Sequence, residues 1–159
     1  MITWLTETIA GKFITTFMIS MLPVVELRGG IPYGLEMGLS YPLALAAAVA
    51  GNIFPVPFII LFIKNVFDFL RKKSSKLDAL TTKLENKAHL KGRIVTKYGT
   101  IGLCLLVAIP LPGTGAWTGS LVAAILGMRL RRAFPTIVAG VLIAAAIVSV
   151  VYSVTKQII

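Results

Sequence analysis

The chain has 159 residues, of which 57% are hydrophobic and only 14% are charged, and its net charge is +10. A soluble domain of this length would carry nearer a quarter of charged residues. The composition excludes an ordinary soluble domain and predicts one integral membrane domain over residues 1–159.

Most of the excess positive charge lies in one segment. Residues 64–97 contain ten Lys or Arg and three Asp or Glu, a net charge of +7, whereas the rest of the chain carries +3. Basic segments of membrane proteins tend to stay in the cytoplasm and to contact anionic lipid headgroups. We therefore expect a cytoplasmic connector with lipid partners, and no nucleic-acid binding, because no recognition motif accompanies the charge.

The first apolar run is too short to cross a membrane. Residues 1–12 have a mixed composition that includes Trp4, which predicts an interfacial helix. Residues 13–25 are uncharged but number only 13, whereas a spanning helix needs about 20. We expect this run to enter the membrane and return as part of a re-entrant helical hairpin.

Charged and helix-breaking residues follow this run directly. Glu26 and Arg28 precede a glycine-rich stretch, residues 29–38, that also contains Pro32. Gly and Pro disfavour a continuous helix. Ionisable groups and broken backbone are unfavourable in hydrocarbon unless they face protein or water. We therefore expect the hairpin to turn and return between residues 26 and 38.

The next segment is long enough to span. Residues 42–63 are 22 uncharged residues. The small residues between positions 44 and 51 permit close helix approach and predict the face of a homodimer. Asn52, Pro55 and Pro57 follow. They indicate either an ordinary kink or a polar notch that faces a cavity, and both interpretations remain open.

The connector, at about residues 65–97, predicts a surface helix. Ser75 with Asp78 resembles a capping box. Apolar residues then recur near helical spacing among the lysines, at Leu77, Leu80, Leu84 and Ala88. This pattern is typical of an amphipathic helix on the membrane surface, and a solvated linker is the alternative.

A second broken segment follows the connector. Residues 101–128 carry no charge, but two prolines and three glycines fall within residues 110–119 and exclude one clean helix. Thr114 and Thr118 supply hydroxyl groups, and Trp117 supplies an apolar wall with one donor. We expect a second re-entrant hairpin here.

The two halves of the chain repeat at an offset of 89 residues. Each half consists of a broken hairpin and then a spanning helix, over about residues 12–64 and 98–157, and the second span is residues 133–155. The offset aligns Pro23 with Pro112, Gly30 with Gly119, Gly38 with Gly127 and Gly51 with Gly140. Because each half crosses the membrane once, the two units are expected to form an inverted repeat, as in many transporters.

The alternative topology has four plain spanning helices. It would place Arg129, Arg131 and Arg132 outside the cell, against the positive-inside tendency. Re-entrant hairpins return these arginines to the cytoplasm, so we expect both termini outside.

Glu26 and Arg28 are the centre of the predicted site. A buried carboxylate can carry protons, and a nearby guanidinium favours its charged form. Arginine also binds phosphate in a fork geometry, and glycines can expose backbone N–H groups to an anion. The predicted substrate- or proton-binding residues are Glu26, Arg28, Gly29, Gly30, Tyr33, Asn52, Thr114, Trp117 and Thr118. A permanent Glu26–Arg28 pair that only holds the loop is the structural alternative.

Catalytic and metal chemistry are not indicated. Cys104 and His89 each occur once, and no nucleophile–base set has usable spacing. We expect no enzymatic activity, no cofactor and no metal.

Two stretches resemble the signature segments of the small multidrug export protein family. They are Glu-Leu-Arg-Gly-Gly-Ile-Pro-Tyr-Gly at residues 26–34 and Pro-Leu-Pro-Gly-Thr-Gly-Ala-Trp-Thr-Gly at residues 110–119. The resemblance covers nearly the whole chain. This family is in turn similar to the DedA/VTT superfamily, which is associated with inverted re-entrant hairpins, proton-dependent transport and translocation of phospholipids or polyprenyl phosphates.

The resemblance implies a DedA-like transporter that moves a small molecule or a lipid-phosphate carrier through a midplane site, with proton coupling as one option. Glu26 matches the DedA acid of the first hairpin, and residues 127–134 resemble its Gly-Met…Arg-x-Phe segment. The second DedA acid is matched only loosely by Glu36, and Ile137 and Val138 replace an asparagine. A detailed coupling scheme therefore does not transfer. The alternative is a scaffold or assembly factor that does not transport and keeps Glu26 dry and paired.

Overall fold

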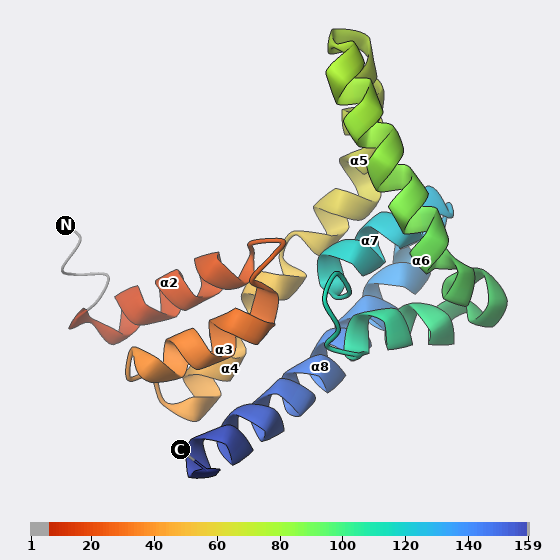
Figure 1. Cartoon of the computed structure of the whole chain (residues 1–159). Helices are drawn as coiled ribbons and strands as arrows, with labels where there is room; N and C mark the ends of the chain where they lie inside the picture. Colours follow the sequence, from red (N-terminus) through yellow and green to blue (C-terminus); the bar gives the residue numbers. More distant parts are fainter. Residues whose placement is uncertain (1–6, 159) are drawn as a thin grey trace.

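A computed structural model describes residues 7–158, and within this range all regular structure is helical (Figure 1). The helices are α2 (Ile9–Ser20), α3 (Glu26–Glu36), α4 (Tyr41–Ile53), α5 (Val56–Lys73), α6 (Ser75–Ala108), α7 (Ala116–Ile125) and α8 (Leu130–Ile158). The predicted all-α class is confirmed. The expected interfacial position of Trp4 lies outside the described residues.

Two stretches are long and apolar enough to cross a membrane. They are Tyr41–Lys73, which combines α4 and α5, and Leu130–Ile158, which is α8. Both predicted spans are thus found in longer form, and α2 and α7 are shorter apolar helices. This pattern of two long and two short apolar segments matches the order expected from the sequence.

Helices α2 and α3 form an antiparallel hairpin. A Cβ atom added to Gly30 would meet Ser20, and one added to Gly34 would meet Thr16, so positions along the two helices run in opposite directions. The turn between them occupies residues 21–25.

The turn predicted between residues 26 and 38 was therefore placed wrongly. That stretch is helical as α3, even at Pro32. Its glycines allow close packing, because Gly30 also faces Ala48, and Gly34 faces Ala44. Glycine weakens a helix by only about 1 kcal/mol relative to alanine. Packing against α2 and α4 on both sides offsets that cost.

Helices α4 and α5 are separated by a break at Phe54 and Pro55, as the paired prolines predicted. The small residues of α4 pack within the protomer. Ala44 and Ala48 are fully buried, and Gly51 lies against the Phe17 carbonyl of α2. Ala46 and Ala50, the other small residues of this stretch, are exposed, so the predicted dimer stays a prediction.

The basic connector is a helical hairpin rather than one surface helix. Helix α5 continues to Lys73, and α6 begins at Ser75 after a one-residue break. The cap is Ser74, whose side chain accepts the Lys76 N–H at 3.4 Å, one residue before the predicted capping box. Residues 75–98 are helical and mostly exposed, so both the surface helix and a solvated linker with helical content stay open.

Arg71 of α5 forms ion pairs with α6 and so joins the two arms of this hairpin. Its side chain lies 3.5 Å from the Asp78 carboxylate and also binds Glu85. Figure 1 shows the end of α5 and the start of α6 projecting together away from the other helices. Leu80 and Leu84, two of the predicted apolar positions of α6, remain exposed.

Helix α6 bends sharply at Gly99, where φ is 59° and ψ is −132°. This backbone conformation favours glycine. Gly102 then packs against the Ile94 carbonyl, so the chain folds back on itself. The loop 109–115 follows, and helix resumes at Ala116, so the predicted break over residues 110–119 is confirmed only in its first part.

The helix boundaries repeat along the chain. Helices α3 and α7 end 89 residues apart, at Glu36 and Ile125, and α4 and α8 begin 89 residues apart, at Tyr41 and Leu130. This spacing equals the offset found in the sequence. The order of a short helix, a joint and a long apolar stretch therefore occurs twice.

The joints between these helices share a conformation. Gly38 has a φ of 84° and Gly127 has a φ of 68°, both in the left-handed region that glycine tolerates best. The alignment of these two glycines in the sequence thus has a backbone reason.

The core lies where the two halves meet. One cluster of side chains that are at most 1% exposed includes Leu27 and Ile31 of α3, Val107 of α6, Val122 of α7 and Ile137 of α8. Because α3 belongs to the first half and the other helices to the second, folding brings residues about 90 positions apart into contact.

Candidate functional site

Glu26 is a buried acid at the first position of α3, with only 4% of its surface exposed. Its φ of 51° is in the left-handed region, which residues other than glycine rarely adopt. The Glu26 N–H donates to the Leu22 carbonyl at 3.0 Å across the hairpin turn. Strain of this kind persists only where surrounding contacts hold it.

The Glu26 carboxylate caps helix α7 from the other half of the chain. Its Oε1 accepts the Trp117 N–H at 3.3 Å. Gly115, the cap residue of α7, has no side chain to do this, and a Cβ atom there would overlap the Glu26 carboxylate. The free N–H groups and partial positive charge of a helix N-terminus favour a carboxylate at this position.

Burial raises the pKa of the Glu26 carboxyl to about 7, and the Trp117 N–H, the Arg28 guanidinium and the Ala116 N–H act in the opposite direction. Glu26 lies outside both candidate membrane spans. A carboxyl group with this pKa exchanges protons near neutral pH.

Arg28 does not form the predicted ion pair with Glu26. Its guanidinium donates to the Leu111 carbonyl at 2.6 Å and to the Thr114 hydroxyl oxygen at 2.9 Å. Within residues 7–158 the salt bridges are those of Arg71. The reason is geometric, because side chains two positions apart on a helix do not face each other.

Thr114 organises the loop that Arg28 reaches. Its hydroxyl oxygen also accepts a hydrogen bond from the Leu111 N–H at 3.2 Å. The same hydroxyl group is a donor to the Ile109 and Leu111 carbonyl oxygens, each at 2.7 Å. Thr118 donates to the Gly113 carbonyl at 3.0 Å. Thr114 thus joins the two halves, whereas Thr118 stabilises its own loop.

Trp117 also joins the two halves of the chain, and here the donor comes from the second half. Its indole N–H donates to the Met21 carbonyl at 2.9 Å, in the turn between α2 and α3. The structure therefore brings together four of the predicted residues, Glu26, Arg28, Thr114 and Trp117, from segments about 90 residues apart.

Other predicted residues do not join this group. The Gly29 N–H donates to the Val25 carbonyl at 3.1 Å, and Gly30 packs on Ser20, so the predicted anion cradle of free N–H groups is wrong. Tyr33 is half-buried about 10 Å further along α3, at 1.5 Å per residue.

Asn52 is buried on α4, with 1% of its surface exposed. Its Oδ1 accepts no hydrogen bond within the described part of the chain. This leaves the polar-notch interpretation of Asn52 open.

Sequence reasoning missed Lys91. This residue lies on α6, and its ammonium group donates to the Gly113 carbonyl. Ten basic residues in the connector gave no signal that one of them reaches the second loop. Only the bend at Gly99, which returns the chain toward α7, brings Lys91 there.

An apolar cavity of about 340 Å³ adjoins the site. Trp117 and Thr118 form part of its wall, and the other lining residues come from the first turn and from α5, α6 and α7: Pro23, Ile59, Ile63, Phe67, Leu84 and Leu121. Ligand cavities typically have this size and apolar lining.

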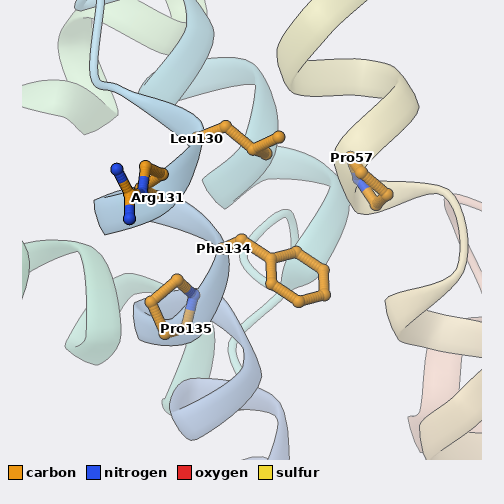
Figure 2. A pocket seen from close by; sticks show the side chains of 5 residues that line it. All are labelled: Pro57, Leu130, Arg131, Phe134 and Pro135. Atoms are coloured by element: carbon orange, nitrogen blue, oxygen red, sulfur yellow. The ribbon is translucent and has the colours of Figure 1, made fainter.

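A separate cavity of about 390 Å³ lies between α5 and α8 (Figure 2). Phe134 and Leu130 extend from α8 toward Pro57 of α5, whereas Arg131 is directed away from Pro57. None of the predicted site residues lines this cavity.

Residues 26–147, about three quarters of the chain, match the family described as "Putative small multi-drug export protein". The chain belongs to this family. The family match begins at Glu26 and includes both site segments. No curated protein and no solved structure matches this small multidrug export family protein. The predicted relationship to the DedA/VTT superfamily stays a prediction.

Proposed function

We propose that this small multidrug export family protein is a membrane transporter of the DedA-like type, in which Glu26 carries a proton between two re-entrant hairpins. The observation that carries the proposal is the buried Glu26 carboxylate, shared between the two halves. Asp, Asn, Ser or Thr commonly caps a helix within its own chain segment. A buried glutamate that reaches across two segments, with a pKa near neutrality, has the properties of a proton carrier.

The proposed architecture is an inverted repeat. Helices α2 and α3 form the first hairpin, and the end of α6 with α7 forms the second. The common 89-residue spacing of the helix boundaries supports a repeat. One full crossing per unit would invert the second unit relative to the first.

Protonation offers a way to couple the two hairpins. The ionised Glu26 carboxylate accepts the Trp117 N–H at the start of α7. Neutral carboxylic acids are weaker acceptors and interact less with the helix dipole. Proton uptake would therefore loosen the contact between the first turn and α7, and proton release would restore it.

The transported compound would be a small molecule or a lipid-phosphate carrier, as the family resemblance implies. The cavity beside Trp117 has room for an apolar group of drug-like size. Arg28 supplies a cation at the edge of the second loop. We propose no enzymatic step.

The connector and the membrane surface form a second contact. Lys72, Lys73 and Lys76 are exposed where α5 meets α6, and Leu80 and Leu84 are exposed beside them. This mixture of ammonium and apolar groups suits anionic lipid headgroups on the cytoplasmic side. A homodimer is also proposed.

Proton flux in proteoliposomes tests the proposal. Vesicles containing an internal pH dye would receive dodecyl phosphate or dodecyltrimethylammonium as probes. Wild-type protein should move protons in response to one of them, and Glu26→Gln should reduce that flux at least tenfold. Glu7→Gln is the control, because Glu7 is exposed and precedes α2. Equal flux in Glu26→Gln and wild type, at equal folded yield, would reject Glu26 as the carrier.

A scaffold that does not transport remains the second candidate. It is favoured by the bonding of Glu26, Arg28 and Trp117, since these contacts alone could fasten the two halves. A scaffold predicts no probe-driven flux in the wild type. It also predicts that Glu26→Gln and Arg28→Ala lower thermal stability without a separate effect on transport.

A further inference from the structure

Helices α3 and α4 pack side by side and run in opposite directions (Figure 1). A Cβ atom added to Gly34 would lie 3.0 Å from the Ala44 Cβ atom. A Cβ atom added to Gly30 would lie 3.4 Å from the Ala48 Cβ atom. Moving from the first pair to the second goes four residues back along α3 and four residues forward along α4. These two pairs fix which positions of the two helices are level with each other.

One further step of four residues makes Glu26 level with Asn52. Positions four apart lie on the same face of a helix, so both residues belong to the facing sides of α3 and α4. The chain beyond Asn52 stays near this place, because Ile59 of α5 lines a cavity together with Pro23 and Trp117. Glu26 and Asn52 are both buried, with 4% and 1% of their surfaces exposed. Asn52 therefore lies beside the segment that holds the Glu26 carboxyl.

Asn52 supplies a buried acceptor that has no donor. Within residues 7–158, the buried side-chain polar atoms without a hydrogen-bond partner are Asn52 Oδ1 and Ser149 Oγ. Ser149 is remote from Glu26, because it shares a groove with Tyr41, and Tyr41 is about 16 Å from Asn52 along α4. An unpaired buried acceptor is unfavourable, so a donor that reaches Asn52 Oδ1 would be stabilised there.

The Glu26 carboxyl gains a donor when it binds a proton. The ionised carboxylate has acceptor atoms only, and its Oε1 accepts the Trp117 N–H at the start of α7 at 3.3 Å. The first N–H groups of a helix are donors, so they do not accept a hydrogen bond from a neutral acid. Proton uptake therefore leaves the new O–H group without a partner at α7.

We infer that Asn52 positions the protonated form of Glu26. The carboxylate takes a proton from water, leaves the N-terminus of α7 and donates its new O–H to Asn52 Oδ1 on α4. Release of the proton to water breaks this hydrogen bond and returns the carboxylate to the Trp117 N–H. This inference rests on the proposed proton carriage by Glu26 and deepens it, because it gives the neutral acid a position of its own.

The charged groups around Glu26 are cations. Burial raises the pKa of the Glu26 carboxyl, and the Arg28 guanidinium opposes this rise. Lys91 of α6 binds the Gly113 carbonyl in the loop before α7. Helices α4 and α7 carry no charged side chain, and Lys12 of α2 lies near the other end of α3. Helix α8 also packs against α3, and its charged residues are Arg131, Arg132 and Lys156. Because Arg and Lys stay charged near neutral pH, we assign a pH-dependent change at this site to Glu26.

Infrared difference spectra of the full chain in lipid vesicles, between pH 5 and 9, test this inference. The C=O band of the protonated Glu26 carboxyl is identified by its loss in Glu26→Gln. Asn52→Leu keeps the size of the side chain and removes the acceptor. It should move this band to higher wavenumber and lower its titration midpoint by about one pH unit, because the neutral acid loses its hydrogen bond. Ser149→Ala is the matched control, since it removes the other unpartnered buried atom, and it should change neither quantity.

Two further variants separate positioning from folding. Asn52→Gln keeps an amide oxygen and should recover part of both shifts. Asn52→Ala removes the acceptor without adding bulk, and it should reproduce the shifts even if Asn52→Leu does not fold. The same band position and midpoint in the wild type and Asn52→Ala, or equal shifts in Ser149→Ala, overturn the inference.

Proton flux in proteoliposomes separates this inference from the proposed function. Asn52→Leu should lower the probe-driven proton flux about fivefold, because the neutral acid loses a hydrogen bond. Glu26-dependent flux with unchanged spectra in the Asn52 variants rejects only this inference. No probe-driven flux in the wild type rejects the transport function, and the spectra then decide the position of the neutral acid by themselves.

Discussion

Glu26 combines three features that are each unusual: a left-handed backbone conformation, a buried carboxylate and a role as the cap of a distant helix. The N-terminus of α7 stabilises the ionised form, and burial stabilises the neutral form. Burial has the larger effect, and it raises the pKa to about 7. The protonation state of this one residue is therefore expected to influence both stability and transport.

The pH dependence of the free energy of unfolding should reflect the protonation of the Glu26 carboxyl. Because its pKa is raised in the folded state, the folded protein binds this proton more tightly than the unfolded chain. The contribution is fully present below pH 4.5 and is lost as the pH rises through about 7. The difference is on the order of 3 kcal/mol, at about 1.4 kcal/mol per pKa unit.

Thermal unfolding in detergent between pH 4.5 and 8 measures this effect. Glu26→Gln should remove this component of the pH dependence, whereas Glu36→Gln should keep it. If the wild type and Glu26→Gln show the same pH profile, the proton equilibrium of Glu26 differs from our assignment.

At the scale of secondary structure, tertiary packing decides which segments are helical as much as intrinsic helix propensity does. Helix α3 contains three glycines and a proline in eleven residues, yet it is helical between α2 and α4. Because its glycines have no side chains, Ser20, Thr16 and side chains of α4 pack closely against its backbone. A stretch that looks like a loop from its composition is therefore a helix in a crowded environment.

The small-residue face of α4 should be essential within one protomer. Ala48 is fully buried against α3, so Ala48→Leu would overpack the contact with Gly30 and should cost about 1–3 kcal/mol. Ala50→Leu is the control, because Ala50 is exposed on the same helix. Unfolding temperature and size-exclusion profile would be compared. Normal stability with loss of a dimer in Ala48→Leu would instead return this face to a dimer interface.

At the scale of the whole molecule, contacts between the two halves of the chain build the candidate site. The first unit contributes Glu26 and Arg28, and the second contributes the loop and the start of α7. Helix α8 packs against helices of both units. A shared site of this kind fits a transporter in which the two units move relative to each other.

The topology should place the connector and the start of α8 on the same side of the membrane. In a Cys104→Ala background, Lys83→Cys and Arg129→Cys should both react with an impermeant thiol reagent only from the cytoplasm. Gln157→Cys, near the other end of α8, should react only from outside. All three positions are exposed. Reaction of Arg129→Cys from outside alone would favour four plain spans and remove the inverted-repeat proposal.

The sequence by itself determined the helical class, the two long apolar stretches, the break near Pro55, the first part of the break predicted over residues 110–119, and the family. These features depend on local composition, because charge content, prolines and hydrophobic runs act over a few residues. The 89-residue spacing was also readable, since it is carried by glycines at joints such as Gly38 and Gly127.

Only the tertiary structure decided which groups the site residues bind. Arg28 binds the distant loop instead of Glu26, Glu26 caps α7, and Lys91 reaches Gly113. These contacts join positions 22 to 91 residues apart. Their pairing depends on how the two hairpins pack and on the bend at Gly99, and no local pattern encodes it. Spacing in the sequence therefore located the site, while the fold determined which atoms meet there.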